Sequence, residues 1–223
     1  MSKVIIGLIG DKVKGYLPHE SAEKTLSSLF EKLDTFTEYE WLPSEKITIE
    51  LIEKYDLIWV GSGPYLNEEK VLIAIQYVRE NDIPVIGTCS GFKYMIIEYA
   101  KNVLKATNPF EYISRNENCS REYKELSIEL KKGSTLVDIY NTPIINEISH
   151  CTYQIAPAIF QKMSEEFEFC GKAQDGRTVL IQLPCHPFYV AALFLPQLKS
   201  NSKLILAWLK LVIKPIQSSP SIS

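Results

Sequence analysis

Residues 84–104 read PVIGTCSGFKYMIIEYAKNVL, a stretch that runs from an apolar strand through a tight turn into a helix. A short, continuous apolar run is typical of a strand that is buried on both faces of a sheet. In Gly87-Thr88-Cys89-Ser90-Gly91 a cysteine stands between small residues, which is the pattern of a nucleophile elbow. The glycines are expected to permit the sharp turn that leaves the central side chain exposed above the sheet. This stretch therefore predicts a reactive cysteine at the end of a strand.

Strand and helix patterns alternate on both sides of this elbow. The patterns predict strands at 3–10, 36–42, 56–63 and 83–89, and helices at 20–33, 67–81 and 90–104. This alternation is typical of a parallel sheet with helices on both faces. Right-handed crossovers place the ligand site of such a sheet at the carboxyl ends of its strands. We expect the site there, between segments 61–65 and 88–91.

The second half of the chain has a different character. Residues 123–155 contain short strand-like pieces separated by turn signals, so we expect them to add antiparallel strands. Residues 167–188 predict a hairpin with Asp175-Gly176 as its turn, and residues 201–214 predict a closing helix. We find no internal repeat and no linker. The expectation is a single α/β domain over residues 1–214, followed by a disordered tail at 215–223.

Composition narrows the class of function. A net charge of −3 over 223 residues gives no electrostatic case for nucleic acid or an anionic membrane as partner, and no apolar run is long enough to span a bilayer. The start of the chain reads as a strand and not as a signal peptide. The odd number of cysteines, without paired spacing, fits reduced thiols in a cytoplasmic protein. We expect no metal site and no cofactor. We expect four cysteines to serve in packing, namely Cys119, Cys151, Cys170 and Cys185, although Cys185, beside His186, is open to oxidants.

A thiol at the elbow ionises at neutral pH only if nearby groups stabilise its thiolate. Its ordinary pKa is near 8.5, and lowering it by roughly 2 units takes about 3 kcal/mol. The amide dipoles at a helix start supply at most ~1 kcal/mol, so a cationic partner is required and histidine is the usual one. The chain contains His19, His150 and His186. His186 is the best candidate, because it ends an apolar strand that should bring it to the same rim as Cys89.

Four segments together resemble a known family. The chain resembles the glutamine amidotransferase domain of CTP synthase, a class I amidotransferase. The resemblance lies in four segments, in this order and rough spacing: YDLIWVGSGPY, IPVIGTCSGFKYMIIEYAKNVL, HCTYQIAP and LPCHPFYVAALFLPQL. The resemblance covers roughly residues 3–214 and is closest to free-standing proteins without the synthetase half. It implies a flavodoxin-like open parallel sheet with an antiparallel appendage. It also implies hydrolysis of the glutamine side-chain amide, with ammonia passed to a separate synthetase partner.

The resemblance assigns roles to individual residues. Cys89 matches the nucleophile and His186 the base that orients it and protonates the leaving amine. Gly61-Ser62-Gly63 falls where the oxyanion loop lies, and the amides of Cys89 and Ser90 would complete the oxyanion hole. Tyr65 either rims the site or packs beside it, and Tyr153 and Gln154 fall in the substrate-binding segment. His150 either lines the pocket or is structural.

Three departures from the family pattern leave the substrate open. The catalytic histidine is normally followed by Pro-Glu, but here His186 is followed by Pro187-Phe188. The oxyanion loop is usually Pro-Gly-Gly, and the arginine that holds the glutamine carboxylate is replaced by Thr152. A thiol depends less than a hydroxyl on its third partner, so Phe188 weakens catalysis without excluding it. The alternatives are a cysteine hydrolase or transferase acting on another small amide, and a binding or regulatory module without catalysis. A homodimer is left open.

Overall fold

The strands of the first half form the parallel part of one mixed sheet. The computed structural model describes residues 4–33, 37–116 and 122–212. Its parallel strands are β2 (Thr37–Leu42), β1 (Val4–Ile9), β3 (Leu57–Val60), β4 (Val85–Thr88) and β11 (Tyr189–Ala192), in that spatial order. The strands β3, β4 and β11 are buried along their whole length, which explains their uninterrupted apolar sequences.

The second half of the chain extends this sheet with antiparallel strands. The order beyond β11 is β10 (Thr178–Gln182), β9 (Glu168–Ala173), β6 (Lys124–Leu130) and β7 (Ile144–Ser149). The predicted hairpin is confirmed: β9 and β10 are paired, and Gly176 in their turn has a positive φ of 86°. Two further strands, β5 (Ile113–Arg115) and β8 (Tyr153–Ile155), pair with each other in a separate small sheet.

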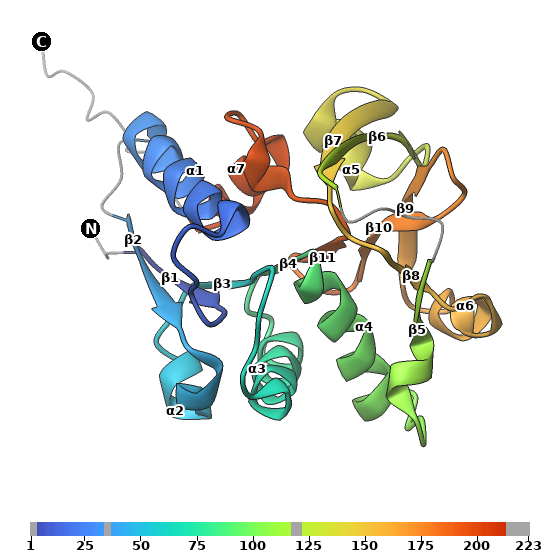
Figure 1. Ribbon diagram of the computed structural model, residues 1–223, viewed down its shortest axis with the longest axis horizontal. Helices are drawn as coiled ribbons and strands as arrows, with labels where there is room; N and C mark the ends of the chain where they lie inside the picture. The colour runs from blue at the N-terminus through green and yellow to red at the C-terminus, as the bar shows by residue number, and fades with distance from the viewer. Residues whose placement is uncertain (1–3, 34–36, 117–121, 213–223) are drawn as a thin grey trace, which may run out of the picture.

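Helices cover both faces of the parallel strands, as predicted. In Figure 1, α1 (Leu17–Leu33) and α7 (Lys203–Leu209) lie on one side of the sheet, with α3 (Glu68–Glu80) and α4 (Ser90–Asn102) on the other. Shorter helices are α2 (Ile49–Ile52), α5 (Thr135–Tyr140) and α6 (Pro157–Met163), with 3-10 turns at Ser44–Lys46, Pro109–Tyr112 and Pro196–Leu198. The chain therefore forms a mostly parallel sheet between helices with an antiparallel extension, which is the arrangement that the sequence predicts.

Some expectations fall outside the described residues. These are the placement of Lys3, Phe36 and Cys119, the last residues of the closing helix and the tail at 215–223. Among the helices that the structure does describe, none has both the length and the apolar character needed to cross a membrane.

Candidate functional site

The predicted elbow is present, and its strain lies on the cysteine itself. Cys89 joins β4 to α4 with φ 54° and ψ −106°, a backbone region that non-glycine residues seldom occupy. The flanking glycines serve another purpose, because each allows a close approach. A Cβ on Gly91 would lie 2.1 Å from the carbonyl oxygen of Val60, and one on Gly87 would lie 2.2 Å from the Met95 sulfur. The elbow thus holds its thiol where strand, turn and helix meet.

Cys89 is buried at this junction and is surrounded by polar groups. Its backbone amide donates to Ala192 O at 2.9 Å, which fastens the elbow to the end of β11. A hydrogen bond with the Cys151 thiol, followed by burial, raises the pKa of Cys89. The amide and hydroxyl of Ser90 also bond to the sulfur and oppose this rise. Cys89 is therefore the protonated member of a pair of thiols.

Cys151 is the group that the sequence failed to assign to the site. Its amide donates to Ser149 Oγ at 3.2 Å, and its carbonyl accepts from Arg177 Nη1 at 3.2 Å. The hydrogen bond from Cys89 lowers the pKa of Cys151, and the Tyr153 amide and the charges of Arg177 and Lys93 lower it further. The expectation that Cys151 only packs is therefore wrong, because it shares a hydrogen bond with the elbow thiol.

His186 does not lie beside Cys89, and this part of the prediction is wrong. In the parallel pair β4–β11, Tyr189 lies opposite Val85 and Ala192 lies opposite Thr88. His186 precedes β11 whereas Cys89 follows β4, so the two residues stand at opposite rims of the sheet. Four strand residues separate these rims, which amounts to about 13 Å.

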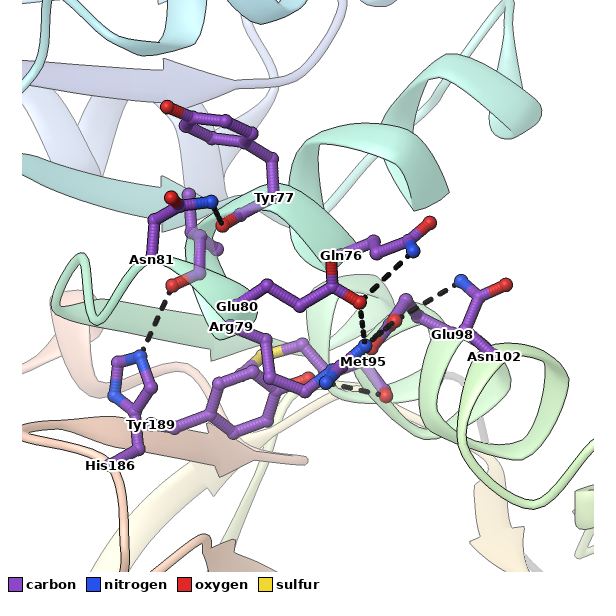
Figure 2. Close-up of polar contacts among 11 residues, drawn as sticks. Gln76, Tyr77, Arg79, Glu80, Asn81, Met95, Glu98, Asn102, His186 and Tyr189 are labelled. Carbon is purple, nitrogen blue, oxygen red and sulfur yellow. Dashed lines mark hydrogen bonds and ion pairs between the residues drawn. The ribbon is translucent and has the colours of Figure 1, made fainter.

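The His186 ring is fully engaged at its own rim. Figure 2 shows it pointing toward the end of α3, where Nε2 bonds Val78 O at 3.2 Å. The Phe188 amide donates to Nδ1 at 3.1 Å, so Nε2 carries the proton. Burial lowers the pKa of His186, which favours the neutral ring. These contacts give His186 a structural role.

The direction of β10 explains the position of His186. The sequence predicts that the strand ending near Pro184 raises His186 to the rim of Cys89. Strand β10 instead runs antiparallel to β11, so its carboxyl end points to the opposite rim. The same argument removes Phe188 from the site, because it stands at the start of β11 and its carbonyl accepts from Val85 N.

The residues that follow β11 reach the correct rim. They are Leu195-Pro196-Gln197, which keep the central proline of the family's His-Pro-Glu pattern. Leu195 is completely buried and its amide donates to Ile148 O at 2.8 Å. The Gln197 side-chain amide approaches Ser62 Oγ at 3.4 Å. Of these two x-Pro-x runs, His186-Pro187-Phe188 precedes β11 and Leu195-Pro196-Gln197 follows it. The strand register selects the second run, which has no histidine.

The other two histidines have defined contacts of their own. The Val13 amide donates to His19 Nδ1 at 3.1 Å, so Nε2 is the protonated nitrogen that donates to Gly63 O at 2.8 Å. Burial lowers the pKa of His19. His19 thus holds the loop after β3 through its neutral ring. The ring of His150 stacks on Tyr123 with a centroid distance of 4.6 Å.

The predicted oxyanion loop lies next to the elbow. The Gly91 amide donates to Gly61 O at 3.1 Å, and the Tyr65 hydroxyl donates to the same oxygen. At Gly63 a Cβ would lie 3.2 Å from Ser90 Oγ. The structure therefore brings Gly61, Gly63, Tyr65 and Ser90 together with Cys89. Their roles in binding a substrate stay predictions.

The predicted substrate segment follows Cys151 directly. The ring of Tyr153 lies 5.2 Å from Lys93 Nζ, a cation from the first turn of α4. The Thr152 carbonyl accepts from Asn116 N at 2.7 Å, and Gln154 donates to Ser114 Oγ at 3.3 Å. Gln154 also lines an open cavity of about 450 Å³. Within the described part of the chain, no group of three or more His, Cys, Asp or Glu side chains could hold a metal ion.

Comparison with known proteins decides the family. Residues 19–190 match the family model described as glutamine amidotransferase class-I. The chain belongs to the class I glutamine amidotransferase family. The match ends inside β11, ahead of Leu195.

Curated relatives and solved structures place the chain within this family. It is 30% identical to CTP synthase of Bacillus subtilis (strain 168) over 89% of its length, and 29% identical to CTP synthase of Onion yellows phytoplasma. The chain spans only 42% and 41% of the lengths of these relatives. Its fold matches the Trypanosoma brucei CTPS glutaminase domain with bound acivicin, with a TM-score of 0.82, 18% identity and coverage of 93% and 92% of the two chains. A glutamine amidotransferase from Thermotoga maritima matches at a TM-score of 0.60 and 12% identity, over 94% and 84% of the two chains.

Proposed function

We propose that Cys89 hydrolyses the side-chain amide of glutamine, or of a similar small amide, through an acyl thioester. The observation that carries this proposal is the elbow thiol at a positive φ, hydrogen-bonded to a second thiol of lowered pKa. Family membership supports the reaction class, since the family model that matches residues 19–190 describes class-I glutamine amidotransferases. The single domain predicted for residues 1–214 would carry this reaction in the cytoplasm, where the free thiols of the described chain are expected to stay reduced.

Cys151 takes the place of the missing histidine in this proposal. Cys89 passes its proton to the Cys151 sulfur and attacks the amide carbon, while amides near Gly61–Gly63 and Ser90 would stabilise the oxyanion. Cys151 then returns the proton to the departing ammonia, and water releases the acid from the thioester. Because the pKa of Cys89 is raised and that of Cys151 is lowered, the proton transfer is uphill. Each unit of pKa difference costs a factor of about 10 in rate, so hydrolysis should be slow.

Recognition of the amide would differ from the family pattern. Thr152 cannot form a bidentate bond with the carboxylate of glutamine. Lys93 lies against Tyr153 in the same region and could supply a single positive charge instead. The ammonia would pass to a separate synthetase partner, as the resemblance to CTP synthase implies.

Ammonia release from a panel of small amides, beginning with glutamine, tests this proposal. Wild-type protein should release ammonia slowly and Cys89→Ser should release none, whereas Cys185→Ser should match the wild type because Cys185 is an exposed thiol away from the elbow. Equal release by the wild type and Cys89→Ser would reject the proposal.

A second function is favoured by one observation, the buried apolar Leu195 at the rim where a base would stand. In this alternative the fold binds a small amide without turning it over. The double variant Leu195→His with Gln197→Glu restores the family pattern on this run. A strong rise in ammonia release by that variant, from an inactive wild type that still binds glutamine, would select the binding function.

A further inference from the structure

The contact between Cys89 and Cys151 allows chemistry between the two sulfurs that needs no amide substrate. The two residues come from distant segments, yet both are tied to the end of β11. The Cys89 amide donates to Ala192 O, and the Ser149 hydroxyl, which accepts from the Cys151 amide, donates to Leu193 O. Two adjacent carbonyls thus anchor both cysteines. The backbone thus brings the two cysteines together from separate segments, and a hydrogen bond joins their thiols.

The surroundings of this thiol pair favour the thiolate at one sulfur and the protonated thiol at the other. Cys151 lies near the cations Arg177 and Lys93, which favour the thiolate at this sulfur. Cys89 has no comparable cation among its principal influences and keeps its proton, which it shares with Cys151. An attacking thiolate beside a protonated resolving thiol is the arrangement that a two-cysteine redox centre requires.

We infer that Cys89 and Cys151 form a reversible disulfide when the protein meets hydrogen peroxide. Each cysteine is only 6% exposed, so an oxidant close to water in size suits the site. This inference goes beyond the proposed function, because it depends on the sulfurs alone. Its consequence, that oxidation blocks the elbow nucleophile, rests on the proposed function.

The chemistry balances in two steps. The Cys151 thiolate attacks one peroxide oxygen, the O–O bond breaks, and the products are Cys151 sulfenic acid and hydroxide. Cys89 then loses its proton, its sulfur attacks the Cys151 sulfur, and the hydroxyl leaves as water. Two thiols are oxidised by two electrons and one peroxide is reduced. A low-molecular-weight dithiol reverses the change by thiol–disulfide exchange.

Peptide mapping by mass spectrometry after treatment with hydrogen peroxide tests the inference. The expected result is a linked pair of peptides containing Cys89 and Cys151, about 2 Da lighter than the two thiol peptides because two hydrogens are lost. A dithiol should remove the link. In Cys89→Ser the Cys151 sulfenic acid should persist and be trapped by a 1,3-diketone reagent, and in Cys151→Ser no linked peptide should form.

Cys170→Ser is the matched control, since Cys170 is also buried and free but its pKa is raised by burial. This variant should still form the link between Cys89 and Cys151. Oxidation of exposed Cys185 while both elbow thiols stay unlinked would overturn the inference. The mapping needs no turnover, so a reduced protein that releases no ammonia from any amide, but still forms the link with hydrogen peroxide, would reject only the proposed function.

Discussion

At Gly91 the absence of a single Cβ decides whether the elbow can form. The Val60 carbonyl oxygen occupies the place that a Cβ would need, at 2.1 Å. Gly91→Ala must therefore move backbone, and we expect a loss of more than about 3 kcal/mol in the free energy of unfolding. Gly87→Ala meets the flexible end of Met95 first and should cost about 1–3 kcal/mol. Urea denaturation measures both. A Gly91→Ala variant as stable as the wild type would contradict the packing described here.

The lowered pKa of Cys151 should change how its reactivity with electrophiles depends on pH. Its pKa is lowered, so its thiolate persists at pH values where an ordinary thiol is protonated. Alkylation of Cys151 by iodoacetamide should continue as the pH falls from 8 to 7, whereas alkylation of a short cysteine peptide, whose pKa is near 8.5, should decline about tenfold over that one unit. Rates followed by mass spectrometry check this. A decline at Cys151 that parallels the decline of the peptide would show that Cys151 is an ordinary thiol.

At the scale of elements, an ion pair joins α3 to α4. Glu98 is completely buried and its carboxylate accepts from Arg79 Nη2 at 2.8 Å and Nε at 3.0 Å (Figure 2). Arg79→Met would leave this charge buried and uncompensated, at a cost of about 3–5 kcal/mol. Adding Glu98→Gln to that variant should restore part of the loss, because the charge is then gone.

Thermal unfolding of these variants gives the measurement. Glu80→Gln is the control, since Glu80 also pairs with Arg79 but is exposed, and its loss should change stability by less than about 1 kcal/mol. Similar losses in Arg79→Met and Glu80→Gln would mean that burial does not govern this pair.

Sequence patterns predict some properties of the helices and strands and not others. Buried strands such as β3 and β4 and amphipathic helices such as α3 were predictable, because burial on both faces and on one face leave distinct periodicities. The direction of β10 was not, since an apolar run looks the same whether it runs parallel or antiparallel to its neighbour. Because the direction of β10 was unknown, His186 was predicted at the wrong rim of the sheet. The partnership of Cys151 with Cys89 depends on long-range packing, which leaves no mark on local sequence.

For the whole molecule, the antiparallel extension should make stability depend on pH. Burial raises the pKa of Glu147 on β7 to about 7, from an ordinary 4.5. The folded state therefore holds this proton more tightly than the unfolded state. The resulting stabilisation is full below pH 4.5 and disappears as the pH rises through 7, a change of about 3 kcal/mol.

Glu147→Gln should remove this loss, because the glutamine cannot ionise. The variant should match the wild type at pH 4.5 and exceed its stability at pH 8 by up to about 3 kcal/mol in urea denaturation. Glu129→Gln, at an exposed position of the paired strand β6, should follow the wild type at both pH values. Parallel curves for the wild type and Glu147→Gln would contradict the assignment.

The central claim is that Cys89 works with Cys151 and not with His186. The most direct measurement is the rate at which an electrophilic glutamine analogue labels Cys89 in the wild type, Cys151→Ser and His186→Gln. The glutamine at position 186 retains an N–H donor for Val78 O but cannot act as a base. We predict that His186→Gln is labelled at the wild-type rate, while Cys151→Ser is labelled at least about tenfold more slowly because the general base that takes the Cys89 proton is gone. Slow labelling of His186→Gln together with normal labelling of Cys151→Ser would contradict it.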